Sequence, residues 1–295
     1  MKIGLFLINS KSLFQGQQKT SGLAAAKAAG AALDVFFAEG ESRAQRDQMF
    51  AYLREGESPT AVVVEPVEDT GLRFVAQEAL RKGSAWVMLN RTPSWVADLG
   101  QEMKGLAFCV TADQKGIGRV QGDQYRALLP NGGTVLYGAG PSLADSAQER
   151  LAGMEETKGP LISTIKIVGG WTEKSGYDAV RSWLETTRGF VEFHLLGAQN
   201  DDMALGAKKA ASEMAAVLGK AAWRDVPATG VDGMAEFGMR LVEERTLAAT
   251  VIMPPTAGKA VELLAATRPG GTPAPAITTI PVMSHPHLSL LRAKR

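Results

Sequence analysis

One run in the second half of the chain combines a short apolar segment, a polar turn and the start of a helix. Phe193–Leu196 is apolar and is typical of a strand covered on both faces. Asp201 or Asp202 is expected to cap the following helix, because a carboxylate there accepts hydrogen bonds from the free N–H groups of the first turn. Asn200 then lies at the carboxyl end of a parallel strand, where open α/β sheets bind ligands. A helix cap and nothing more is the alternative for this turn.

Other predicted strands also end in polar or aromatic residues. These candidates for ligand binding are Phe14, Gln15, Asn90, Arg91, Gln148, Trp171, Asp232 and Met253. Several have a purely structural alternative: Arg91 as a surface ion pair, Trp171 as part of the core, and Asp232 as a helix cap.

The usual catalytic motifs are missing, so we expect that the chain is not an enzyme. Gly138-Ala139-Gly140 is not followed by the third glycine of a dinucleotide fingerprint. The short run Gly140-Pro141-Ser142 lacks a glycine that the nucleophile elbow requires. His285 and His287 have no acidic or cysteine partner nearby in the sequence, so we expect no metal site and no cofactor.

Short apolar runs alternate with amphipathic segments from end to end, which is typical of parallel sheets wound by right-handed crossovers. The predicted strands are 3–8, 33–37, 61–65, 85–89, 106–110, 134–137, 164–168, 193–196, 227–231 and 248–252. The predicted helices are 21–32, 44–54, 72–82, 115–129, 148–156, 177–187, 203–219 and 257–264. This is an α/β protein with more strands than one small sheet needs, which favours two lobes.

The turn at Asn200–Ala207 and the segment Gly230-Val231-Asp232-Gly233 carry a resemblance to a known family. They are similar to the same turns in sugar-binding proteins of the type I periplasmic family, the ribose-binding protein group. The resemblance extends over nearly the whole chain. It implies two Rossmann-like lobes with parallel sheets, a ligand cleft between them and three crossings of the chain. Residues 1–112 and 254–280 would form the N-terminal lobe, and residues 113–253 and 281–295 the C-terminal lobe.

The same resemblance assigns roles to the candidate residues in the N-terminal lobe. Phe14, with Gln15 beside it, stands where the family places an aromatic ring against the sugar. Asn90-Arg91 is similar to an acidic residue and an arginine that together bind ring hydroxyls.

In the C-terminal lobe, Gln148 stands where the family has an arginine, and Trp171 resembles a second stacking aromatic ring. Asn200 and Asp232 match the family pattern, and Met253 replaces a glutamine. With Asn90 in place of an aspartate, the site would be less charged and more apolar than the ribose pattern. These differences exclude ribose itself and leave the ligand class unchanged.

The physical reason for these residue types is that a sugar presents hydroxyl groups and weakly apolar C–H faces. Aspartate and asparagine accept hydroxyl hydrogen bonds, arginine donates a planar fork, and an aromatic ring covers the sugar face.

Composition excludes other classes of partner. The 295 residues include 32 basic and 31 acidic side chains, a net charge of +1, so we expect no binding to nucleic acid. Cys109, the single cysteine, lies in an apolar run and is expected to be a buried structural thiol. The resemblance implies a monomer whose partners are a small sugar or polyol and a membrane permease.

The first residues are interpreted as a strand rather than as an export signal, because the apolar run Ile3–Ile8 is too short for one. We therefore expect a periplasmic protein if Met1 replaces a removed signal peptide, and a cytoplasmic protein if Met1 is the natural start.

Two functions follow from the resemblance. The first is a solute receptor of an ABC-type sugar transporter that closes around its ligand at a hinge. The alternative is a cytoplasmic sugar sensor related to the effector domains of lactose-repressor-type regulators, without a DNA-binding segment of its own.

Overall fold

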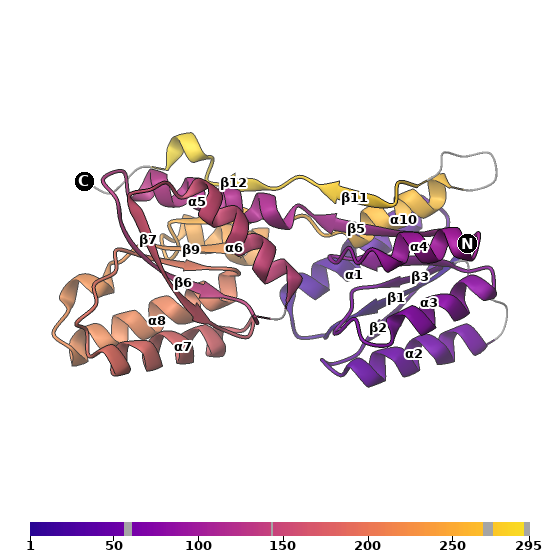
Figure 1. Cartoon of the computed structure of the whole chain (residues 1–295), viewed down its shortest axis with the longest axis horizontal. Helices are drawn as coiled ribbons and strands as arrows, with labels where there is room; N and C mark the ends of the chain where they lie inside the picture. Colours follow the sequence, from indigo (N-terminus) through magenta and orange to yellow (C-terminus); the bar gives the residue numbers. More distant parts are fainter. Residues whose placement is uncertain (56–60, 143, 268–273, 292–295) are drawn as a thin grey trace. The chain divides into compact units, whose positions relative to one another are not determined.

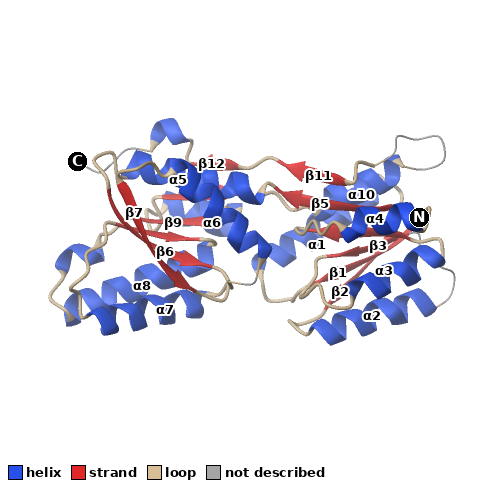
Figure 2. Ribbon diagram, in the orientation of Figure 1, coloured by secondary structure: helices blue, strands red, loops and turns tan. Residues whose placement is uncertain are grey.

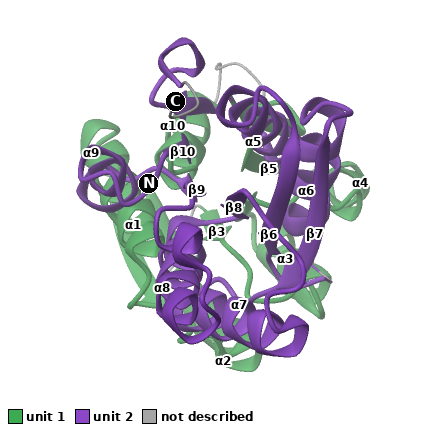
Figure 3. Ribbon diagram, turned by 90° about the vertical axis from the view of Figure 1, so that its left-hand side faces the viewer, with its two compact units in different colours: residues 1–112, 255–280 green, residues 113–254, 281–295 purple. Residues whose placement is uncertain are grey.

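The chain divides into two compact α/β units (Figure 3). Unit 1 comprises Met1–Ala112 and Pro255–Ile280, and unit 2 comprises Asp113–Pro254 and Pro281–Arg295, so the chain passes between them three times. The computed structural model describes residues 1–55, 61–142, 144–267 and 274–291. Each unit has a six-stranded, mainly parallel sheet with helices on both faces (Figures 1 and 2), which confirms the predicted fold class of two α/β lobes.

Unit 1 is built on a parallel sheet in the order β11-β5-β4-β3-β1-β2. Its strands are β1 (Lys2–Leu7), β2 (Ala32–Phe37), β3 (Ala61–Val64), β4 (Ala85–Leu89), β5 (Ala107–Ala112) and β11 (Ile277–Ile280). Its helices are α1 (Leu13–Ala28), α2 (Ser42–Arg54), α3 (Leu72–Arg81), α4 (Trp95–Glu102) and α10 (Ala257–Ala266).

Alternate residues of each unit 1 strand face opposite layers of helices. Val62 and Val64 of β3 pack with α2, α3 and α4, whereas Val63 packs with α1 and α10. This two-sided burial explains why β3 reads as a continuous apolar run in the sequence.

Unit 2 has the strand order β12-β10-β9-β8-β6-β7, in which β12 is antiparallel to β10. Its strands are β6 (Gly133–Ala139), β7 (Ile162–Val168), β8 (Leu195–Ala198), β9 (Ala228–Asp232), β10 (Ala249–Ile252) and β12 (Met283–His285). Its helices are α5 (Gln114–Leu128), α6 (Asp145–Thr157), α7 (Glu173–Thr187), α8 (Asp201–Val217) and α9 (Arg240–Glu243), with short turns η1 (Ala221–Arg224), η2 (Ala235–Met239) and η3 (Leu288–Leu290).

Two pairs of helices cover the faces of the unit 2 sheet. Tyr137 of β6 packs with α5 and α6, and its neighbour Leu136 packs with α7 and α8. The backbones of α5 and α6 come unusually close: a Cβ at Gly118 would lie 2.0 Å from the carbonyl oxygen of Arg150, and one at Gly153 would lie 2.0 Å from that of Lys115. Glycine at both positions is therefore required for the packing that fixes α6, and with it Arg150, against α5.

The structure corrects the predicted start of the first helix. Helix α1 begins at Leu13 rather than Ser21, because Ser12 Oγ accepts a hydrogen bond from Gln15 N at 3.4 Å and caps the helix. Phe14 and Gln15 thus lie in the first turn of α1 and not in a loop. Helix α4 and strands β11 and β12 were not predicted.

Cys109 lies in β5 and is 2% exposed. Burial raises the pKa of its thiol to about 12, so the thiolate is disfavoured, as expected for a structural residue. Among the described residues, none of the helices is long and apolar enough to span a membrane.

Candidate functional site

The candidate residues all lie at, or shortly after, the carboxyl ends of parallel strands. In unit 1, Phe14 and Gln15 follow β1, and Asn90 and Arg91 follow β4. In unit 2, Gln148, Trp171 and Asn200 follow β6, β7 and β8, Asp232 ends β9, and Met253 follows β10. Within each sheet these ends share one edge, which is the ligand-binding edge of open α/β folds.

A buried carboxylate, Glu65, organises this edge of unit 1. Glu65 directly follows β3 and is 7% exposed. Its Oε1 accepts from Asn90 Nδ2 and its Oε2 from Gln18 Nε2, both at 3.0 Å. The amide of Gln15 also interacts favourably with this carboxylate. Burial raises the pKa of Glu65, and the three amides and the charge of Arg91 oppose that shift.

Gln18 extends the cluster to another helix. Its Nε2 donates to Thr256 Oγ1 at 3.0 Å, and its Oε1 accepts from Ala257 N at 2.9 Å. Gln15 is held similarly, since its Oε1 accepts from Ile8 N at 2.9 Å. The ends of β1 and β3 and the first turns of α1 and α10 are therefore joined by buried amide groups, which limits the rotamers of each.

Asn90 and Arg91 have different environments. Asn90 has a left-handed backbone (φ 56°), and its Oδ1 accepts from Ala112 N at 3.4 Å. Arg91 Nη1 pairs with Asp69 Oδ1 at 2.9 Å, and Nη2 donates to Val67 O at 3.3 Å. The guanidinium is thus held on the loop after β3.

The aromatic candidate of unit 1, Phe14, is buried, with 8% of its surface exposed.

The centre of the unit 2 edge is the buried guanidinium of Arg150, which is 5% exposed. Its Nε donates to Gln114 Oε1 at 2.8 Å, Nη1 to the carbonyl oxygen of Gln199 at 2.5 Å, and Nη2 to Met253 Sδ at 3.2 Å. These three acceptors are neutral. Burial lowers the pKa of Arg150, and the negative charge of Asp232 opposes this shift.

Trp171 lies over the same guanidinium. Its ring centroid is 5.5 Å from Arg150 Cζ, within the range of a cation–π contact. The indole also rests on Gly140, where a Cβ would lie 2.2 Å from ring atom Cζ2. Its backbone is left-handed (φ 66°), and its carbonyl oxygen accepts from Asn200 Nδ2 at 2.9 Å.

Asn200, and not Asp201 or Asp202, is the N-cap of α8, because its Oδ1 accepts from Met203 N at 2.9 Å. The predicted cap was therefore one or two residues too late. The amide of Asn200 serves the cap with its oxygen and Trp171 with its nitrogen, which fixes its orientation at the end of β8.

Asp232 is 8% exposed and has a left-handed backbone (φ 98°) at the end of β9. Its carbonyl oxygen accepts from Met253 N at 3.1 Å, which places the two candidate residues side by side where the adjacent strands β9 and β10 end. Electrostatically it acts on both Arg150 and Asp201. A carboxylate, a guanidinium, an indole and an amide are thus gathered at one edge of unit 2.

Gln148 is not part of this group. It is exposed on α6, and its Nε2 donates to Ser142 O at 2.9 Å. Two residues along a helix point to different faces, so Arg150 is buried where Gln148 is not. Arg150 and Glu65 lie at the centres of these two clusters, and the sequence did not predict either of them. Arg150 could have been identified from the sequence, because it is the one arginine in the run Asp145–Arg150.

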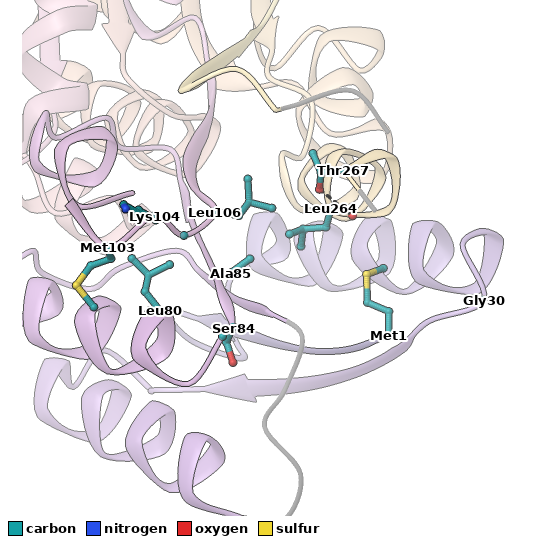
Figure 4. Close-up of a pocket in the computed structure, with 12 residues that line it drawn as sticks. Met1, Gly30, Leu80, Ser84, Ala85, Met103, Lys104, Leu106, Leu264 and Thr267 are labelled. Atoms are coloured by element: carbon teal, nitrogen blue, oxygen red, sulfur yellow. Dashed lines mark hydrogen bonds between the residues drawn. The ribbon is translucent and has the colours of Figure 1, made fainter. Parts of the chain in front are cut away.

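A cavity of about 550 Å³ lies elsewhere in unit 1 (Figure 4). Leu80, Ala85, Lys104, Leu106 and Leu264 are among its lining residues, and it lies by the amino ends of β4 and β5. It therefore does not include the candidate residues. Over the described ranges, no group of histidine, cysteine, aspartate and glutamate side chains could hold a metal ion.

Both edges present groups that suit a polyhydroxylated molecule. Amides and carboxylates exchange hydrogen bonds with hydroxyl groups, a guanidinium donates, and an indole covers an apolar face.

The fold is shared with solved structures of low sequence identity. The periplasmic binding protein component of the arabinose ABC transporter from Shewanella sp. ANA-3 superposes with a TM-score of 0.81 and 21% identity, covering 98% of this chain and 93% of that one. A periplasmic solute binding protein from Actinobacillus succinogenes 130z gives a TM-score of 0.82 with 18% identity and 96% coverage of both chains. A solute binding protein from Bacillus halodurans C-125 gives a TM-score of 0.78 with 20% identity, covering 96% and 93%.

No curated protein sequence matches this chain significantly. A family model does: the model described as periplasmic binding protein domain matches residues 3–268. That range includes both sheets apart from β11 and β12, and every candidate residue. The chain therefore belongs to the periplasmic binding protein domain family.

Proposed function

We propose that this protein binds a sugar or polyol and serves as the solute receptor of an ABC-type transporter. The observation that carries the proposal is the pair of strand-end clusters, Glu65 with its amides in unit 1 and Arg150 with Trp171 and Asp232 in unit 2. Such fixed donors and acceptors suit hydroxyl groups, because each hydroxyl left unpaired on burial costs about 1–3 kcal/mol.

Similar proteins support this ligand class. The Shewanella protein is described with bound L-arabinofuranose, the Actinobacillus protein with D-allose and the Bacillus protein with myo-inositol. These ligands are neutral and rich in hydroxyl groups. The first of these proteins is a component of an ABC transporter, which favours a membrane permease as the partner of this chain.

A panel of neutral ligands tests the proposal. L-arabinose, D-allose, D-fructose, myo-inositol and glycerol would each be added to the purified protein, and thermal unfolding and calorimetric heats measured. We expect at least one to raise the unfolding temperature, because a ligand that binds only the folded state stabilises it by about 2.7 kcal/mol at 100 times its Kd. If no sugar or polyol in this panel or a wider one binds, the proposal is wrong.

We propose further that one ligand contacts the clusters of both units, and that the units close on it. Closure predicts a smaller radius of gyration in X-ray scattering when the best ligand of the panel is added at saturation. The three passages of the chain between the units supply the hinge, since a few residues at element ends can absorb such a change. An unchanged radius would contradict closure.

The family consists of periplasmic binding proteins, and we propose that this chain works as a monomer in the periplasm. Fractionation of cells that express the native gene tests the compartment. Recovery in the cytoplasm would favour the alternative, a sugar sensor that acts through another protein.

A further inference from the structure

We propose that Asp201 is a positioning residue for Asp232: its buried carboxylate holds the turn that aims Asp232 at the ligand. The inference rests on the proposed function, because Asp232 is a ligand residue only if that function is right. It concerns a side chain that was expected to do no more than cap α8.

Asp201 is fully buried at the start of α8, and both of its carboxylate oxygens are used. Oδ2 accepts from Gly233 N at 2.9 Å, and Oδ1 accepts from Thr250 Oγ1 at 2.7 Å. One side chain therefore connects the start of α8 to the turn after β9 and to β10. Gly233 is the residue that follows Asp232, so the first of these bonds acts directly on the turn.

The turn itself needs to be held. Asp232 has φ 98° and Gly233 has φ 57°, and a left-handed conformation is unfavourable for aspartate unless the surroundings impose it. The hydrogen bond from Gly233 N to Asp201 is a direct constraint of this kind. It fixes where the Asp232 side chain leaves the backbone.

The space for the carboxylate is shaped by two glycines. A Cβ at Gly230 of β9 would lie 2.1 Å from Asp201 Oδ1, and a Cβ at Gly238 in η2 would lie 1.9 Å from Oδ2. Any larger residue at either position would displace the carboxylate. The segment after β9 is therefore built around Asp201, which a helix cap alone does not require.

The test compares variants that differ in which bond they lose. Asp201→Ala loses the acceptor for Gly233 N, and Asp201→Ser is the alternative if the alanine variant does not fold. Asp201→Asn keeps an acceptor for Gly233, because the Thr250 hydroxyl can turn to accept from the new amide. Thr250→Val is the matched control: it removes the other bond to the same carboxylate and leaves the Gly233 bond in place.

Two readouts are needed. The first, without ligand, is amide hydrogen exchange at Gly233, which we expect to accelerate at least tenfold in Asp201→Ala and to stay near wild type in Asp201→Asn and Thr250→Val. The second is calorimetric affinity for the tightest binder among L-arabinose, D-allose, D-fructose, myo-inositol and glycerol. We expect a loss of about tenfold or more in Asp201→Ala and less than about threefold in the other two variants.

A double-mutant cycle decides whether the effect passes through Asp232. Adding Asp201→Ala to Asp232→Ala should cost no further affinity. Additive losses, equal losses in Thr250→Val, or unchanged Gly233 exchange in Asp201→Ala would each overturn the inference. If no sugar binds the wild type, the proposed function fails, and Gly233 exchange still decides whether Asp201 holds the turn.

Discussion

Asn90 Nδ2 donates a hydrogen bond to Glu65 Oε1 at 3.0 Å, which joins the ends of β4 and β3. The acidic group at this edge of unit 1 therefore comes from the residue after β3, whereas the residue after β4 is an amide. Burial raises the pKa of this carboxyl group, and the hydrogen bonds that it accepts from amides oppose that shift.

Exchanging these two groups tests the pair. Glu65→Gln should lower the free energy of unfolding by about 1–3 kcal/mol, because one amide donor loses its acceptor. Asn90→Asp should also destabilise, since two carboxylates would meet at hydrogen-bond distance. The double variant restores one amide and one carboxylate and should recover stability in urea unfolding. A double variant no more stable than the sum of the single losses would show that the pair is not coupled.

A second prediction concerns Asp201 and pH. Burial and the charges of Asp232 and Asp202 raise the pKa of Asp201 well above its ordinary value, and the hydrogen bonds from Thr250 and Gly233 do not reverse this shift. The folded state then binds the proton more tightly than the unfolded state. The contribution to stability is full below about pH 4, the unfolded pKa, and is lost as pH rises through the folded pKa.

Asp201→Asn has no such group, so its stability relative to wild type should increase as pH rises from about 4. Urea unfolding of both proteins at several pH values measures the difference, and most other titrating groups cancel in the comparison. A difference that stays constant, or falls with pH, would contradict the raised pKa.

The third prediction separates Arg150 from Gln148 on the same helix. Arg150→Lys should lower the free energy of unfolding by about 1–3 kcal/mol, because one ammonium cannot replace the planar fork that reaches Gln114, Gln199 and Met253. Gln148→Ala, at an exposed position, should stay within about 0.5 kcal/mol of wild type. The loss of sugar affinity should likewise be larger for Arg150→Lys than for Gln148→Ala. Equal effects of the two substitutions would show that Arg150 contributes no more to stability and binding than an exposed residue of the same helix does.

The fourth prediction uses two nearby glycines. Gly140→Ala should displace the Trp171 indole and cost about 1–3 kcal/mol, since the new Cβ would lie 2.2 Å from the ring. At Gly170 the nearest atom, Ser175 Cβ, is 3.5 Å away, so Gly170→Ala is the matched control. Near-UV circular dichroism and sugar affinity report the displacement. A Gly140→Ala protein with the wild-type spectrum and the wild-type affinity would show that the new Cβ neither displaces the indole nor affects binding.

The sequence predicted most of the fold because buried strands of parallel sheets are continuous apolar runs, as in Ala61–Val64. Strand β11 was missed because its four residues, Ile277–Ile280, alternate between exposed and partly buried side chains. The start of α1 was missed because its first turns are rich in glutamine, and Gln15 and Gln18 are buried there by hydrogen bonds rather than by apolar packing.

The site was only partly predictable for a similar reason. Asn200 and Asp232 are recognisable because the carboxyl ends of strands bind ligands in this fold class. Glu65 ends a predicted strand, but its importance comes from Gln18, which is 47 residues away, and no local pattern shows that contact. Arg150 lies two residues after Gln148 in the sequence, but which face of α6 is buried depends on the close packing at Gly118 and Gly153.

Calorimetric titration of the best sugar or polyol of the panel into single variants of the two units is the most direct test of the central claim. The variants are Glu65→Gln in unit 1 and Asp232→Ala in unit 2, with Asp98→Ala, on the exposed side of α4, as the control acid. We expect both site variants to weaken binding of the same ligand by about 1–3 kcal/mol and the control to leave it unchanged. Wild-type affinity in either folded site variant would contradict a ligand held by both units.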